Sequence, residues 1–297
     1  MKMKIIPLLA AFVLTLFSMP VSGQESNGVK APEKVKKKED FHLYLLIGGS
    51  NMLVKNTFKD NDSKSYPSIF LFDDGNKWIS AENHVKSCEG KEVQGEGTGP
   101  SIHFAEAMLS RTKDKDIMIG LINCAQEDSG LPDWMKGGKY YAKAVERAKL
   151  AMETGILKGI LWHQASAEMK KADPSAYAND IGKIAVDLRK DLNSPSFHPT
   201  PFVWGKLVSY PYELDKDKDQ FKVLNDTLQK TFNDIDRSGL VESKGLKDSG
   251  DGIRFDAESM NEFGKRYADA MIYLEGKQPA KVRKNLENKK IFDNKGR

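Results

Sequence analysis

The sequence predicts an α/β fold, a three-layer α/β/α sandwich built on a mainly parallel sheet. Short apolar runs alternate with amphipathic helical patterns from residue 99 onward, and this alternation requires right-handed crossovers between parallel strands. The run at 43–47 (Leu-Tyr-Leu-Leu-Ile) is uninterrupted, which is typical of a strand covered on both faces. A chain of 297 residues with 39% hydrophobic residues is long enough for one large core, so we expect a single domain.

The N-terminal segment has the pattern of a secretory signal peptide. Residues 1–4 are basic, residues 5–19 are apolar, and small residues at 21–23 offer a cleavage site before Gln24. The apolar stretch is short for a membrane span, although an uncleaved anchor is the alternative. We therefore expect a signal peptide at 1–23, a polar lysine-rich linker at 24–40, a periplasmic or secreted protein, and no membrane span after cleavage.

Charge and cysteine content limit the classes of partner. The formal net charge is +4, and much of the basic excess lies in residues 30–38 and in the tail at 276–297. These are solvated ends rather than a nucleic-acid-binding face. Cys88 and Cys124 are the two cysteines, and they either form a disulfide in an oxidising compartment or remain two buried thiols. They imply no metal site, and nothing in the sequence implies a cofactor.

The predicted domain, residues 41–275, begins with the strand that ends at 48–50 (Gly-Gly-Ser). The two glycines can form a sharp turn. We expect a short helix next, and then a long excursion over 55–97 that helps to shape a pocket. Within it, apolar runs at 69–72 and 77–79 flank Asp74 and Gly75, which predicts a β-hairpin.

The later elements follow from hydrophobic periodicity. Apolar residues recur at helical spacing in five segments and form short continuous runs between them. The predicted helices contain residues 104–108, 141–152, 177–188, 221–232 and 260–271, and the predicted strands contain 117–122, 160–162, 201–207 and 239–241.

Ser50 is the first candidate for chemistry. In open α/β sheets, ligands bind at the carboxyl ends of the strands, and a hydroxyl at that edge is a candidate nucleophile. The alternative is that Ser50 only caps the following helix.

Five blocks give this serine a family context. Residues 48–52 (Gly-Gly-Ser-Asn-Met), 97–100 (Gly-Thr-Gly-Pro), 125–134, 157–164 (ending Trp-His-Gln) and 251–258 (Asp-Gly-Ile-Arg-Phe-Asp-Ala-Glu) occur in this order. In motif and order they resemble SGNH hydrolases of the sialate O-acetylesterase and acetylxylan esterase branch, over roughly residues 41–273. The resemblance implies a flavodoxin-like sheet and serine-dependent hydrolysis of acetyl esters on sugars.

Carried over by position, the resemblance makes Ser50 the nucleophile, Gln164 an oxyanion donor and Asp251 the acid that orients the catalytic base. Serine needs such a base to become nucleophilic, and the tetrahedral intermediate needs preorganised donors. The position of the base, histidine in the family, is Arg254 here. Arginine stays protonated at any ordinary pH and cannot act as a base.

Other blocks also depart from the family pattern. Gly49 stands where the family has glutamine, and Glu127 and Asp128 stand where it has two glycines. After Gln164, the expected Gly-Glu-Ser-Asp reads Ala-Ser-Ala-Glu at 165–168. Carboxylates near a developing oxyanion oppose catalysis. We therefore expect a kept fold with impaired hydrolysis.

An active serine acetylesterase would require another histidine of the chain to act as the base. His163 alternates away from Gln164 on its strand, and His42 lies at the opposite end of the sheet. His84 and His198 fall in predicted loops, and His103 begins a helix near the pocket.

The expected ligand is an acetylated or acidic carbohydrate, with Asn51, Glu127, Asp128 and Arg254 as candidate binding residues. Arg254 either pairs with Asp251, Glu127 or Asp128 in a structural ion pair or holds an anionic group of the ligand. A third possibility is a non-enzymatic interaction module that never fills the pocket.

Tryptophans offer the remaining candidates for sugar contact. Trp78, Trp134 and Trp162 either stack on sugar rings or pack in the core.

Overall fold

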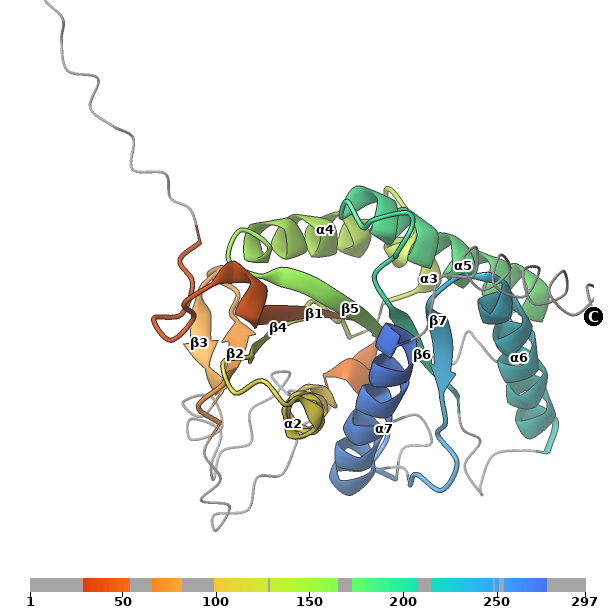
Figure 1. Ribbon diagram of the computed structural model, residues 1–297. Helices are drawn as coiled ribbons and strands as arrows, with labels where there is room; N and C mark the ends of the chain where they lie inside the picture. Colours follow the sequence, from red (N-terminus) through yellow and green to blue (C-terminus); the bar gives the residue numbers. More distant parts are fainter. Residues whose placement is uncertain are drawn as a thin grey trace, which may run out of the picture.

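The computed structural model describes residues 29–53, 66–81, 99–127, 129–164, 173–207, 215–247, 249–250 and 254–276, with the backbone alone at 215–219. It is an α/β/α sandwich around a seven-stranded sheet in the order β3-β2-β4-β1-β5-β6-β7 (Figure 1). The strands are β1 Phe41–Gly48, β2 Ile69–Phe72, β3 Trp78–Ser80, β4 Met118–Asn123, β5 Ile156–His163, β6 Phe202–Gly205 and β7 Ser238–Val241. The helices are α2 Ser101–Arg111, α3 Leu131–Trp134, α4 Lys139–Ala151, α5 Pro174–Asp191, α6 Asp215–Asp234 and α7 Ala257–Gly276, with 3₁₀ turns η1 Lys38–Asp40 and η2 Ser50–Met52.

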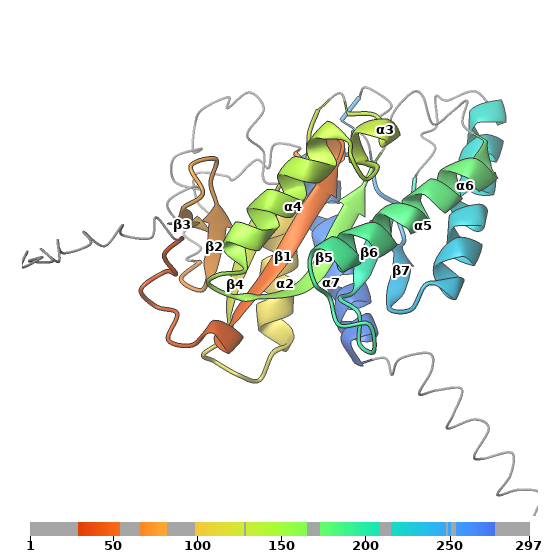
Figure 2. The same cartoon turned by 90° about the horizontal axis from the view of Figure 1, so that it is seen from above.

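The central strand β1 is buried on both faces, as its uninterrupted apolar run predicts. Leu43, Leu45 and Ile47 face the core formed with α4, α5 and α6, whereas Tyr44 and Leu46 face the core formed with α2 and α7. These two groups of helices lie on opposite sides of the sheet in Figure 2. The predicted three-layer fold class is therefore confirmed.

β1 is the middle strand of the sheet and pairs in parallel with both of its neighbours. It pairs with β4 on one side and with β5 on the other, so that Leu46 lies between Asn123 and Leu161. The chain reaches β4 after α2 on one face and reaches β5 after α4 on the other face. The carboxyl ends of β4, β1 and β5 therefore border the point where ligands bind in such sheets.

The predicted hairpin is confirmed, with one correction. β2 and β3 pair antiparallel, but β2 also pairs parallel with β4, so the hairpin extends the central sheet and is not only an insertion above its edge. The left-handed backbone conformation falls on Asn76 (φ 57°) rather than on Gly75. Asparagine tolerates this conformation better than most residues. The other parts of the excursion, 54–65 and 82–98, lie outside the described residues.

The chain before β1 packs on the domain. Val29 and Val35 contact the core on the α4 side, and the Lys34 ammonium donates to Pro67 O at 3.3 Å. The boundaries of signal peptide, linker and tail stay predictions, because residues 1–28 and 277–297 lie outside the described residues. In the described part of the chain, no helix is both long enough and apolar enough to cross a bilayer.

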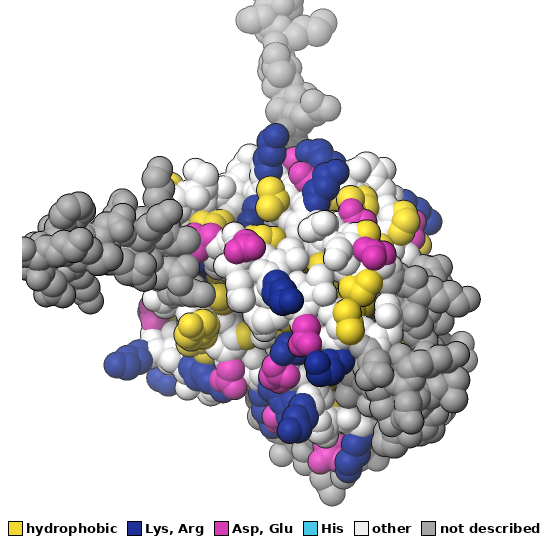
Figure 3. Space-filling model, turned by 90° about the vertical axis from the view of Figure 1, so that its right-hand side faces the viewer, with side chains coloured by type: hydrophobic (Ala, Val, Ile, Leu, Met, Phe, Trp, Pro, Cys, Tyr) yellow, Lys and Arg dark blue, Asp and Glu magenta, His cyan; other side chains and the backbone are white. Residues whose placement is uncertain are grey.

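Surface charge is mixed on the side where α6 lies in Figure 1. Figure 3 shows Lys and Arg side chains interspersed with Asp and Glu side chains over this face.

Cys124, at the end of β4, is a buried free thiol, and burial raises its pKa. Cys88 lies outside the described residues.

Candidate active site

The turn after β1 places Ser50 at the predicted sheet edge. Gly48 has a φ of +118°, and a Cβ built on it would lie 2.1 Å from His163 O, so only glycine fits there. Gly49 has ordinary extended geometry (φ −94°, ψ −163°). The predicted two-glycine turn therefore depends on Gly48 alone. Ser50 then opens η2, a single 3₁₀ turn in place of the expected short helix.

Two neighbouring segments hold this turn in place through hydrogen bonds, one on each side. Gln126 N donates to Gly48 O at 2.9 Å, which joins the loop after β4 to the residue two before Ser50. On the other side, Phe255 N donates to Asn51 Oδ1 at 3.0 Å, and Asn51 is 1% exposed. Asn51 thus joins the Ser50 turn to the segment that carries Arg254.

The backbone of Met52, two residues after Ser50, also contacts neighbouring segments. Its carbonyl accepts from Asn123 Nδ2 at 3.0 Å, while Asn123 Oδ1 accepts from Ala125 N at 3.0 Å. Gly99 has a φ of +52°, and a Cβ there would lie 2.3 Å from Met52 O. The Gly-Pro entry to α2 is therefore required by close approach to the Ser50 turn. Sequence reasoning missed Asn123, although a carboxamide at the end of a buried strand is a signal.

Gln164, which directly follows β5, is 2% exposed and reaches the loop after β4. Its Nε2 donates to Ser129 O, and a Cβ built on Gly49 would lie 3.6 Å from its amide nitrogen. Because β1 lies between β4 and β5, this side chain connects loops that flank the β1 turn. Its predicted role as an oxyanion donor stays a prediction.

Ser129 was also missed by sequence reasoning. Its hydroxyl donates to Gln126 O at 2.9 Å and accepts from Trp134 Nε1 at 3.0 Å. Trp134 and Trp162 are 1% and 0% exposed and pack edge-to-face in the core, as the packing alternative for the tryptophans predicts.

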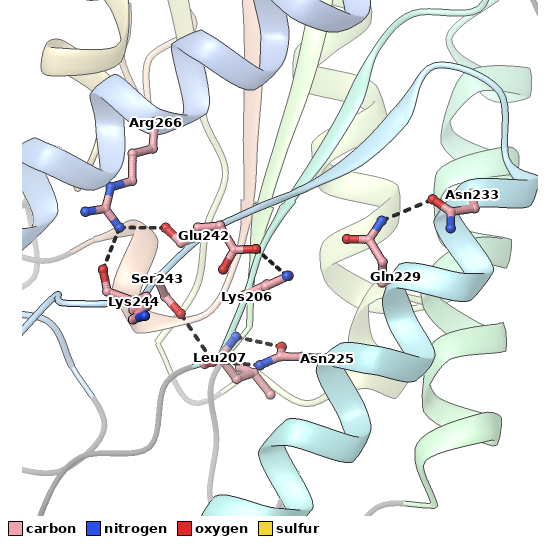
Figure 4. A network of polar contacts seen from close by, with 9 residues as sticks. All are labelled: Lys206, Leu207, Asn225, Gln229, Asn233, Glu242, Ser243, Lys244 and Arg266. Atoms are coloured by element: carbon pink, nitrogen blue, oxygen red, sulfur yellow. Dashed lines mark hydrogen bonds and ion pairs between the residues drawn. The ribbon is translucent and has the colours of Figure 1, made fainter.

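Arg254 lies on a segment braced by α7. Arg266 Nη1 donates to Glu242 O at 3.0 Å and to Lys244 O at 2.9 Å, and the neighbouring network also pairs Lys206 with Glu242 (Figure 4). Farther along, Ser249 N donates to Arg254 O at 2.8 Å, on either side of residues 251–253. Asp251 itself lies outside the described residues.

Asp256 then starts α7. Its Oδ1 accepts from Ser259 N at 2.7 Å, which is an N-cap bond, and its own N–H donates to Lys247 O at 3.0 Å. A Cβ on Gly264 would lie 2.4 Å from Pro100 O. α7 therefore packs closely on the start of α2, and its N-terminus fixes the position of residue 254.

The Arg254 guanidinium pairs with Glu127. Nη1 lies 3.3 Å from Oε1, and the side chains are 47% and 54% exposed. Of the pairings predicted for Arg254, the one with Glu127 is present, more exposed than a buried structural pair. It joins the two segments that flank Ser50. Asp128 lies outside the described residues.

Ser50 is half-buried, and no hydrogen bond to its hydroxyl occurs within the described residues. His163 lies on the side of α7, with its ring 5.6 Å from Phe255 and 5.4 Å from Phe263. His103 Nδ1 pairs with Glu106 Oε2 at 3.0 Å in α2. Within the described ranges, no group of three or more His, Cys, Asp or Glu side chains is arranged to hold a metal ion.

His163 gives a testable pH dependence. Desolvation by burial lowers its pKa from 6.5 to about 4, so the unfolded chain binds a proton between pH 6.5 and pH 4 that the folded chain does not. The free energy of unfolding should therefore fall as the pH is lowered through this window, by up to about 3 kcal/mol from this residue. Urea unfolding of the parent protein and of His163→Phe at pH 4.5 and 7 measures it, and equal pH slopes in the two would contradict the assignment.

Comparison with known proteins agrees with this architecture. Residues 40–273 match the family model described as carbohydrate esterase, sialic acid-specific acetylesterase. A probable carbohydrate esterase of Arabidopsis thaliana is 25% identical over 268 residues, which cover 84% of this chain and 97% of the relative.

Two solved structures show the same fold. The X-ray structure of the Arabidopsis protein has a TM-score of 0.59 at 24% identity and covers 78% of this chain and 98% of that chain. The crystal structure of NanS has a TM-score of 0.61 at 15% identity, with 80% and 98% covered. The SGNH hydrolase fold expected from the five blocks is thus confirmed, and the chain belongs to the family of carbohydrate esterases described as sialic acid-specific acetylesterases.

Proposed function

We propose that this chain is a carbohydrate-binding member of the family in which ester hydrolysis is impaired. The observation that carries the proposal is Arg254. It occupies the position that the family resemblance gives to the catalytic histidine, and its guanidinium contacts Glu127 at 3.3 Å. A guanidinium remains protonated and cannot take the proton of Ser50.

The surroundings of the described histidines favour the absence of a substitute base. His42 is the second residue of β1, at the opposite end of the strand from Ser50, and His198 precedes β6 at that same end of the sheet. His163 packs against two phenylalanines, and His103 pairs with Glu106. His84 lies outside the described residues.

The oxyanion side of the site also favours impaired hydrolysis. Glu127 brings a carboxylate to a position where the resemblance implies a glycine, and a negative charge there opposes the charge that develops on the tetrahedral intermediate. The Gln164 amide nitrogen already donates to Ser129 O. Both features weaken stabilisation of an oxyanion beside Ser50.

Arg254 supports binding of an acidic carbohydrate. Its side chain is 47% exposed, so a ligand can reach it. A half-exposed ion pair contributes only about 0–1 kcal/mol, whereas a carboxylate can accept two parallel hydrogen bonds from a guanidinium. An acidic sugar can therefore compete with Glu127 for this side chain.

Two measurements test the proposal. Turnover of an aryl acetate should not exceed that of Ser50→Ala, and robust Ser50-dependent turnover would establish an active serine acetylesterase with an unconventional base instead. Binding of N-acetylneuraminic acid, followed by calorimetry, should survive Ser50→Ala and be lost in Arg254→Ala. Lys244→Ala is the matched control, since it removes an exposed positive charge whose backbone, not side chain, contacts Arg266.

Failure to bind acidic or acetylated sugars would favour a non-enzymatic interaction module.

We further propose that the protein is exported to the periplasm or secreted, on the strength of the pattern at residues 1–23. The N-terminal sequence of the mature protein tests this, with Gln24 as the expected first residue and Met1 as the contrary result.

A further inference from the structure

The ion pair between Arg254 and Glu127 is open to a ligand at the candidate site. Arg254 Nη1 lies 3.3 Å from Glu127 Oε1, and the two side chains are 47% and 54% exposed. Solvent therefore already reaches about half of each side chain, and a ligand can contact both charges without entering the buried core. The pair joins the two segments that flank Ser50, so such a ligand would lie beside the position of the family nucleophile.

Hydrogen bonds of the backbone hold each of these segments independently of the pair. On one side, Gln126 N, in the residue before the glutamate, donates to Gly48 O at 2.9 Å. On the other side, Phe255 N, in the residue after the arginine, donates to Asn51 Oδ1 at 3.0 Å. Neither bond uses a charged group, so the guanidinium and the carboxylate can separate by side-chain rotation while both segments keep their positions. The separation costs little, because a half-exposed ion pair contributes little to stability.

A ligand with a single negative charge replaces only one member of the pair. Its carboxylate can accept two parallel hydrogen bonds from the Arg254 guanidinium. The displaced Glu127 carboxylate then lies near the carboxylate of the ligand, and the two like charges repel each other. A ligand that also carries an ammonium group can place this cation at Glu127. Each of the four charges then has an opposite partner, so the exchange leaves no charge uncompensated.

We propose that Arg254 and Glu127 form a paired subsite for a zwitterionic sugar, which carries both a carboxylate and a free amino group, and that Glu127 selects this ligand over a sugar acid without a cation. This inference rests on the proposed carbohydrate-binding function and names the class of ligand. It gives Glu127 a role in ligand binding, in addition to the effect of its charge on an oxyanion. N-acetylation of the amino group removes the cation, so an N-acetylated sugar acid is the weaker ligand.

Matched pairs of sugars test the selection. The pairs are muramic acid and the methyl glycoside of neuraminic acid, each with its N-acetyl derivative, which keeps the carboxylate and lacks the ammonium charge. In calorimetric titration at low salt, the free amine of at least one pair should bind tighter by about 2- to 5-fold, the range expected for one exposed ion pair. Equal or tighter binding of both N-acetylated forms would overturn the paired subsite and leave carbohydrate binding intact. Binding of no sugar would overturn the proposed function and the subsite together.

Glu127→Gln gives the sharper test, because glutamine keeps the size of the side chain and removes its charge. We expect this variant to bind the N-acetylated forms about 2- to 5-fold tighter than the parent protein does, and its preference for the free amine to fall to near onefold. Asp269→Asn is the matched control, since Asp269 is 62% exposed and pairs with Arg111. Arg111 ends α2 where the chain leads into β4, at the opposite end of the sheet from Ser50. An unchanged preference in Glu127→Gln, or an equal loss of preference in Asp269→Asn, would overturn the subsite.

Discussion

Arg254→His alone is expected to leave aryl acetate hydrolysis about 10²-fold or more below the rate of the double variant Arg254→His with Glu127→Gly, in line with the effect of losing one oxyanion donor. The single change supplies a base, but it also leaves the Glu127 carboxylate without the guanidinium that now contacts it at 3.3 Å. Under the proposed function, that negative charge, in the loop after β4, would oppose an oxyanion at Ser50. Removal of the Glu127 carboxylate should therefore raise the hydrolysis rate more in the Arg254→His background than in the parent protein.

The measurement is kcat/KM for an aryl acetate in both backgrounds, each with Ser50→Ala as its own blank. The comparison is clean because a half-exposed ion pair contributes only about 0–1 kcal/mol to stability, so both variants should fold. Recovery of the full double-variant rate by Arg254→His alone would show that Glu127 does not obstruct the chemistry.

Gly48→Ala should cost about 3 kcal/mol or more of the free energy of unfolding, since a left-handed φ and a steric clash each typically cost about 1–3 kcal/mol. The φ of +118° disfavours any side chain, and the new Cβ would lie 2.1 Å from His163 O. Relief of that clash would break the Gly49 N to His163 O bond of 2.8 Å, which joins the β1 turn to β5.

Urea unfolding of the two adjacent glycine variants provides the check. Gly49→Ala should lie within about 0.5 kcal/mol of the parent protein, as is usual away from strained or tightly packed positions. Similar losses in both variants would mean that the turn is set by something other than the backbone of Gly48.

Much of the fold was predictable because it depends on local pattern. The uninterrupted run in β1 reports burial on both faces, and helical periodicity in α5 and α7 reports one buried face. The pairing of β2 with β4 was not predictable, because strand order depends on packing between distant segments. The same reason explains why the bond from Gln164 to Ser129 was missed, since it requires β1 to lie between β4 and β5.

For the candidate site, the location of residues in the fold was predictable, but their separate structural roles were not. Position along the chain predicted that Ser50 would lie at the sheet edge and that Arg254 would either pair with one of three carboxylates or hold an anionic group of a ligand. The pair with Glu127 is present, whereas Asp128 and Asp251 lie outside the described residues. The separate roles of Gly48 and Gly49 could not be distinguished by residue type, because the difference lies in the backbone angles and in the distance to β5.

The bond between Phe255 N and Asn51 Oδ1 has an evolutionary consequence. The segment that carries residue 254 is attached to the Ser50 turn through the backbone of the next residue and not through the side chain at 254. The backbone frame and the side chain are thereby separable at this position: residue 254 can be exchanged while the hydrogen bond that holds its segment to the Ser50 turn persists. Under the proposed function, a single substitution at residue 254 would remove the catalytic base and leave the binding scaffold in place.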